Sequence, residues 1–181
     1  MDESPDLLVE QLKAGNRAAA EQLVDIYYQQ IYLFMRRLGH SRQVSEDLTQ
    51  ESFLQAWCYI NQLKTGRILN SWLYSIAANI SRLYWRRHKS CEKTGLEYAD
   101  VPDNNDAADI ISRNEQLGRL KNALENLPIK LKETVVLHYM QHLAISEAAA
   151  AAGIREGTFK SRLGRALEIL RRQVICEGGK P

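Results

Sequence analysis

One stretch near the C-terminus constrains the fold more than any other part of the chain. Residues 126–172 read as a helix, then a short helix, a tight turn at Gly153 and the second helix of the turn motif, which begins near Gly157. The apolar residues of this second helix recur at helical spacing and should face inward: Leu163, Ala166, Leu167 and Leu170. Its cations are clustered: Lys160, Arg162 and Arg165. This pattern predicts a helix-turn-helix whose second helix suits a DNA major groove, and a solvated basic helix on an ordinary bundle is the alternative.

Helical periodicity also runs through most of the remaining chain, and β-type alternation does not persist. The exception is a segment rich in acids and poor in large apolar residues, which we interpret as a flexible acidic linker over residues 92–111. A chain of 181 residues has room for one or two domains. We therefore predict an all-α fold with two small helical domains, residues 1–91 and 112–178, joined by that linker.

Composition excludes several classes of protein. The net charge of +2 is only mildly basic, so the distribution of charge is more informative than its sum. The three cysteines are widely spaced and form no zinc-like cluster with histidine, so we expect no metal and no other cofactor. The acidic N-terminus lacks a signal-peptide pattern, and no segment reaches the roughly 20 apolar residues of a membrane span. These features favour a reducing, cytoplasmic location.

The predicted helix over residues 44–63 has two different faces. One face should be core: Thr49, Phe53, Ala56, Trp57, Ile60 and Leu63. The opposite face is polar and acidic around one leucine: Asp47, Gln50, Glu51 and Leu54. Such a face is either a protein-binding surface or a solvated surface with a single exposed leucine. The paired acids alone do not predict catalysis, because no histidine, lysine or glycine-rich loop converges on them.

The predicted helix over residues 69–87 places cations beside an aromatic side chain. Its face opposite the apolar one carries Ser75, Ala78, Asn79, Arg82, Trp85 and Arg86. Cations that meet phosphates and an aromatic ring that stacks on an unpaired base are typical of single-stranded nucleic-acid binding. The alternative is a helix end with cations favoured by the helix dipole and a tryptophan covered by the next domain.

Three segments together resemble a known family, the extracytoplasmic-function (ECF) sigma factors of the sigma-70 family. SEDLTQESFLQAW resembles the core-binding helix of region 2, and NSWLYSIAANISRLYWRR resembles its promoter −10 segment. LPIKLKETVVLHY with GIREGTFKSRLGRALEILR resembles region 4. The segments occur in the family's order and spacing across almost the whole chain. A stand-alone helix-turn-helix activator would account for the last segment only.

The resemblance implies a sigma factor that is not an enzyme and takes no small-molecule substrate. Its implied partners are RNA polymerase core, promoter DNA and an anti-sigma factor, often membrane-anchored. The resemblance assigns polymerase docking to Asp47, Gln50, Glu51 and Leu54. It assigns −10 binding to Lys64, Arg67, Asn79, Arg82, Trp85 and Arg86. It assigns −35 binding to Arg155, Glu156, Thr158, Lys160, Ser161 and Arg165.

The chain also departs from the family pattern at three places. Gly164 stands where the family usually has a larger side chain. The first helix of the turn motif reads ISEAAAAAG in place of a core of the E-I-A-x-x-L-G type, and LKTGRILN before Trp72 is not a close match. The alanine run Ala148–Ala152 suits close packing of that first helix.

Overall fold

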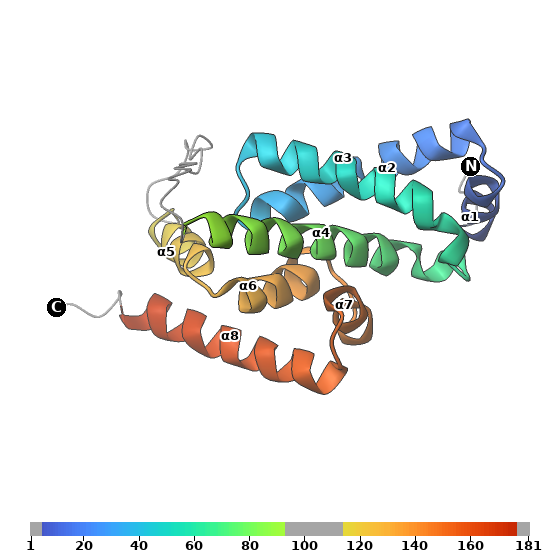
Figure 1. Ribbon diagram of the computed structural model, residues 1–181. Coiled ribbons are helices and arrows are strands. Elements are labelled where there is room, and N and C mark those ends of the chain that lie inside the picture. Colours follow the sequence, from blue (N-terminus) through green and yellow to red (C-terminus); the bar gives the residue numbers. More distant parts are fainter. Residues whose placement is uncertain (1–4, 93–113, 177–181) are drawn as a thin grey trace.

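All regular structure in the described residues is helical, which confirms the all-α prediction (Figure 1). The computed structural model describes residues 5–92 and 114–176, so the predicted linker lies outside the described residues apart from residue 92. The first half contains α1 (Pro5–Lys13), α2 (Arg17–Arg37), α3 (Arg42–Tyr59), the 3-10 turns η1 (Ile60–Gln62) and η2 (Gly66–Ile68), and α4 (Leu69–Glu92). The second half contains α5 (Asn114–Glu125), α6 (Ile129–Val135), the π-helical turn η3 (Val136–Met140), α7 (Ile145–Ala152) and α8 (Glu156–Cys176).

Glycines and polar caps set the helix boundaries where the sequence predicts breaks. Gly15 has φ +76° and Gly39 has φ +97°, backbone conformations that side chains with a Cβ rarely adopt. Asn16 then starts α2 because its side-chain oxygen accepts a hydrogen bond from the Ala18 N–H at 2.9 Å. Ser41 caps α3 in the same way through the Val44 N–H at 3.3 Å. Local sequence chemistry is sufficient to fix these ends.

Helices from both halves of the chain share one apolar core. Figure 1 shows α4 running between α3 on one side and α6 with α8 on the other. The core cluster joins Phe34, Leu73 and Ile80 of the first half to buried residues of the second: Leu131, Val135, Leu137, Ala148, Ala151, Phe159 and Ala166. A separate cluster fastens α1 to α2 and to the turn before α4, with Leu8, Leu12, Leu23 and Leu63 at its centre.

The alanine run explains how closely the two halves approach. Ala148 and Ala151 of α7 are at most 1% exposed and belong to the same apolar cluster as Ala77 and Ala78 of α4. Small side chains on both helices let the two backbones lie close together while still burying apolar surface. The expected close packing of this run is confirmed, and much of it is against the other half of the chain.

Within residues 5–92 and 114–176, no helix combines the length and the apolar character needed to cross a bilayer.

Candidate nucleic-acid interface

The turn motif presents one face of α8 to solvent. Gly153 ends α7 with φ +67°, which allows the tight turn that leads into α8. Phe159 is fully buried and anchors the start of α8 in the core, together with Leu163 and Ala166. The residues predicted to face DNA are all exposed: Arg155, Glu156, Thr158, Lys160, Ser161 and Arg165. The burial pattern therefore leaves a continuous polar surface along the first turns of the helix.

Three of these side chains already have partners on their own helix. Lys160 Nζ lies 4.0 Å from Glu156 Oε2, one turn back, and both side chains remain more than half exposed. Ser161 Oγ donates to the Gly157 carbonyl at 2.9 Å. An exposed i,i+4 pair of this kind contributes only a few tenths of a kcal/mol, so a phosphate can displace it readily.

The face of α4 that was predicted to meet single-stranded DNA is divided. Asn79 and Arg86 are exposed, whereas Ala78 is fully buried against the second half of the chain, contrary to its predicted outward position. Trp85 is half-buried and stacks on His40, with ring centroids 4.9 Å apart. Arg82 is also half-buried. Trp85 is therefore partly covered, but the covering ring of His40 comes from the same half of the chain and not from the next domain, as the alternative interpretation expected.

Arg82 is held by the second half of the chain. Its Nη1 donates to Glu133 Oε1 at 2.5 Å and to the Ala152 carbonyl at 3.2 Å. The Glu133 side chain is 5% exposed. Burial raises the pKa of the Glu133 carboxyl, while the charges of Arg82 and Arg162 lower it. Glu133 thus lies in the field of one cation from α4 and another from α8.

The charged pair at Lys132 and Glu133 was not singled out from the sequence. Both residues are buried, and burial lowers the pKa of the Lys132 ammonium, which donates to the Glu125 carbonyl at 2.9 Å. The sequence LKETV does contain an indication of their burial, because these two charged residues lie between apolar residues of one short helix. Nothing in a single sequence says that another domain covers such a pair.

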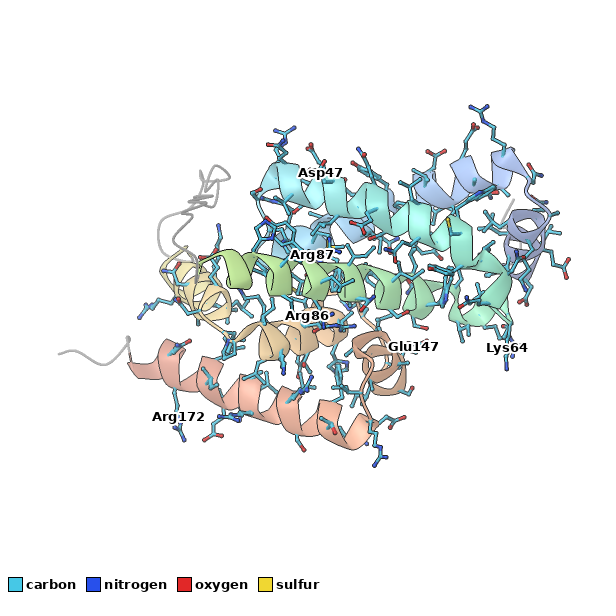
Figure 2. All side chains as sticks on the ribbon, in the orientation of Figure 1. Asp47, Lys64, Arg86, Arg87, Glu147 and Arg172 are labelled. Atoms are coloured by element: carbon cyan, nitrogen blue, oxygen red, sulfur yellow. The ribbon has the colours of Figure 1, made fainter. Side chains whose placement is uncertain are left out.

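The loop before α4 presents two cations and is braced by α1. Lys64 and Arg67 are exposed, and Figure 2 shows Lys64 at the end of the molecule next to α1. Between them, the Gly66 N–H donates to Asp6 Oδ1 at 2.6 Å. A Cβ on Gly66 would lie only 2.3 Å from the Pro5 carbonyl group, so the close approach of these two segments requires glycine. The loop's position therefore depends on α1.

The polar face of α3 is open to solvent as predicted. Asp47, Gln50 and Glu51 are exposed, and Leu54 is 68% exposed. Figure 2 places Asp47 and Arg172, on α3 and α8 respectively, on opposite sides of the molecule. Trp57 was predicted to be core but is 42% exposed, since it lies at the edge of an apolar groove between α1, α2 and α3. That groove has a volume of about 390 Å³ and continues to Gln50 and Leu54.

In the described residues, an all-helical fold combines a basic turn motif, a basic helix and an exposed acidic face, features that are typical of helical DNA-binding proteins. Comparison with known proteins gives the family. Residues 23–91 match the model of sigma-70 region 2, and residues 117–170 match that of sigma-70, region 4. The ECF RNA polymerase sigma factor SigW of Bacillus subtilis is 32% identical over 177 residues, covering 92% of this chain and 94% of the relative.

Other comparisons agree. SigM of Mycobacterium tuberculosis is 30% identical, over 84% of this chain and 76% of the relative. The sigma factor RpoE of Bartonella quintana, solved with the anti-sigma factor NepR, gives a TM-score of 0.65 at 25% identity, over 85% of this chain and 95% of that one. CnrH, solved with the cytosolic domain of CnrY, shares the fold with a TM-score of 0.71 at 23% identity, over 96% and 99% of the two chains.

The chain therefore belongs to the ECF RNA polymerase sigma factors of the sigma-70 family. Proteins of this family initiate transcription and are not enzymes. The presence of region 2 beside region 4 disfavours a stand-alone helix-turn-helix activator, because such an activator would account for residues 117–170 alone.

Proposed function

We propose that this sigma factor directs RNA polymerase core to promoters through three surfaces, each built on one helix or its flanking loop. All six candidate residues of the turn motif, Arg155 just before α8 and five on α8, are exposed opposite an exposed acidic face on α3, and this exposure carries the proposal. DNA and polymerase can then be bound from different sides of the molecule (Figure 2).

The docking surface for polymerase core is the face of α3 formed by Asp47, Gln50, Glu51 and Leu54. An exposed leucine surrounded by carboxylates and an amide offers one apolar anchor with a polar rim, the usual composition of a protein interface. The adjoining apolar groove supports this role because it extends the anchor beyond Leu54. Glu51 also accepts a hydrogen bond from Gln55 Nε2 at 3.2 Å, which orients its carboxylate.

The −10 surface consists of Lys64 and Arg67 in the loop and Asn79, Arg82, Trp85 and Arg86 on α4. The side chains of the two loop cations, Asn79 and Arg86 are exposed to solvent. Arg82 and Trp85 are engaged by other parts of the chain, so their contact with DNA requires a rearrangement. Cations and a stacking ring along one helix are the chemistry that holds a melted strand.

The −35 surface is the exposed face of α8: Arg155, Glu156, Thr158, Lys160, Ser161 and Arg165. A basic second helix of a turn motif lies in the major groove, where its first turns meet base edges and phosphates. Gly164 is exposed, and a Cβ at this position would have no packing neighbour within 4 Å. The absence of a side chain there leaves room for the DNA backbone to approach this helix closely.

The proposal includes action in the cytoplasm and regulation by an anti-sigma factor. The complex of the 25%-identical RpoE with the anti-sigma factor NepR supports this regulation. The family resemblance further implies that the anti-sigma factor is membrane-anchored. We expect the inhibitor to cover both Leu54 and the surroundings of Arg165, because free sigma exposes both. Hydrogen exchange with bound inhibitor tests this, and protection of only one half of the chain contradicts it.

Run-off transcription tests the function directly. Polymerase core is incubated with and without the full chain on genomic fragments, and transcripts are mapped at their 5′ ends. Defined start sites that appear only with the chain, preceded by shared −10 and −35 elements, are expected. The chain with Asp47→Arg and Glu51→Arg serves as the matched control, since it keeps the α8 surface. Transcription that does not depend on the chain contradicts the proposal.

A further inference from the structure

The Arg82 guanidinium is the most strongly engaged of the candidate DNA-binding groups. Its Nη1 contacts both the Glu133 carboxylate at 2.5 Å and the Ala152 carbonyl at 3.2 Å. These two acceptors come from α6 and from the C-terminal end of α7, which belong to the turn-motif half of the chain. A carboxylate oxygen on a guanidinium N–H takes the position that a phosphate oxygen would take. DNA cannot use this donor while Glu133 holds it.

Further polar contacts fasten the same two halves. Tyr74 of α4 donates from its hydroxyl to Gln141 Oε1 at 2.6 Å. Arg37, at the end of α2, donates to the Met140 carbonyl at 3.1 Å. With Arg82, these contacts connect the first half to α6, α7 and the η3 turn. The close packing of α4 against α7 joins the same two halves, so α4 can part from α7 only if these contacts break as well.

The composition of this interface suits a contact that opens. Replacing a buried ion pair with apolar residues of similar volume is often neutral or stabilising, so the pair is not required for packing alone. Glu133 pairs with Arg82 of the −10 helix and also feels the charge of Arg162 on the −35 helix, and both cations favour its charged form. One buried carboxylate is thereby linked electrostatically to both DNA-reading helices.

We propose that the second half of the chain is an internal occupant of the −10 surface, with Glu133 held by Arg82 in place of DNA phosphate. Free sigma is then closed, and single-stranded DNA gains full access to Arg82 only when α4 parts from α6 and α7. The inference rests on the proposed role of Arg82 in −10 binding. It adds that this chain restrains its own DNA binding without any inhibitor.

The test compares Glu133→Gln with wild type by two independent measurements on the full chain. X-ray scattering reports the radius of gyration, and fluorescence anisotropy reports binding to a labelled mixed-sequence single-stranded oligonucleotide. Glu133→Gln should expand the particle and tighten binding by about tenfold, a typical coupling between two sites. The matched control is Glu21→Gln, which removes the same charge from an exposed pair with Arg17 on α2. That control should leave the radius unchanged and alter affinity less than about twofold.

A second variant separates opening from loss of negative charge. Gln141→Ala removes the Tyr74 contact without changing net charge, and it should expand the particle and tighten binding in the same direction. Circular dichroism of both variants verifies that helix content is retained. If Glu133→Gln does not fold, Gln141→Ala carries the test by itself.

A double-mutant cycle decides whether the gain passes through Arg82. In the Arg82→Ala background, Glu133→Gln should give no further gain in binding. An equal gain with and without Arg82 would overturn the proposal, as would an unchanged radius in both opening variants, or expansion without tighter binding. Normal promoter opening by polymerase with Arg82→Ala would instead refute the −10 role of Arg82, while the scattering result would still report whether the interface opens.

Discussion

The imidazole of His40 stacks on the indole of Trp85, with ring planes inclined by 22° and centroids 4.9 Å apart. His40 Nε2 also lies 2.7 Å from Ser81 Oγ, and the residue is only 3% exposed. Burial lowers the pKa of His40 to about 4, and the charges of His88 and Lys132 act in the same direction. The turn between α2 and α3 is therefore joined to α4 by a neutral histidine.

The free energy of unfolding should fall in mild acid because of His40. Its folded pKa of about 4 lies below the ordinary 6.5, so between these values the unfolded chain binds more protons than the folded one. The contribution of His40 is complete above pH 6.5 and is lost as pH falls toward 4. At about pH 5 the loss is on the order of 2 kcal/mol. Urea titrations near neutrality and in mild acid measure it, with His40→Gln as the comparison. An equal acid-induced loss in that variant would assign the effect to other groups.

The substitutions Asp47→Arg and Glu51→Arg together should weaken association with polymerase core by a few kcal/mol, through like-charge repulsion and lost hydrogen bonds. Both side chains are exposed, so the fold should be retained. Affinity for core is measured by titration with labelled chain. The control is Arg17→Glu with Glu21→Arg, which reverses an exposed pair on α2 and should leave affinity unchanged. Undiminished binding of the α3 double variant would mean that polymerase docks elsewhere.

Arg165→Ala and Lys160→Ala should have different effects on promoters. If Arg165 makes a bidentate contact with guanine, its loss costs about 1–3 kcal/mol and relaxes preference at one −35 position. If Lys160 grips phosphate, its loss weakens all promoters alike and reduces the salt slope by about one unit. Transcription from a set of −35 variants at several salt concentrations distinguishes the two. Unchanged strength and preference in both variants would contradict the assignment of α8 residues.

Two glycine-to-alanine substitutions should change stability in opposite directions. Gly66→Ala places a Cβ 2.3 Å from the Pro5 carbonyl group, and the backbone must shift, which costs about 1–3 kcal/mol. At Gly164 on α8, an added Cβ would have no packing neighbour within 4 Å. Gly164→Ala should therefore stabilise the helix by up to about 1 kcal/mol. Thermal unfolding of the two variants measures both effects. Equal stability of Gly66→Ala and wild type would show that α1 does not need this close approach.

Sequence periodicity and caps determined most of the local structure. Gly15 with Asn16, and Gly39 with Ser41, end and begin helices through backbone conformation and side-chain hydrogen bonds that involve only near neighbours. The inward positions of Leu163, Ala166 and Leu170 on α8 follow from the same short-range periodicity. For this reason the sequence alone predicted the exposure of Asp47, Gln50, Glu51 and Leu54 on α3, although it wrongly placed Trp57 of the same helix in the core.

Only the tertiary structure decided where the two halves meet. Ala78, Arg82 and Trp85 lie on the side of α4 that looks outward when the helix is considered alone, yet other parts of the chain cover them to different degrees. Glu133 looks like an ordinary surface acid in the sequence, but it is buried beside Arg82. Helical spacing predicts which residues share a face of one helix. It carries no information on which distant helix covers that face, because that choice depends on the combined burial of apolar and charged groups far apart in the chain.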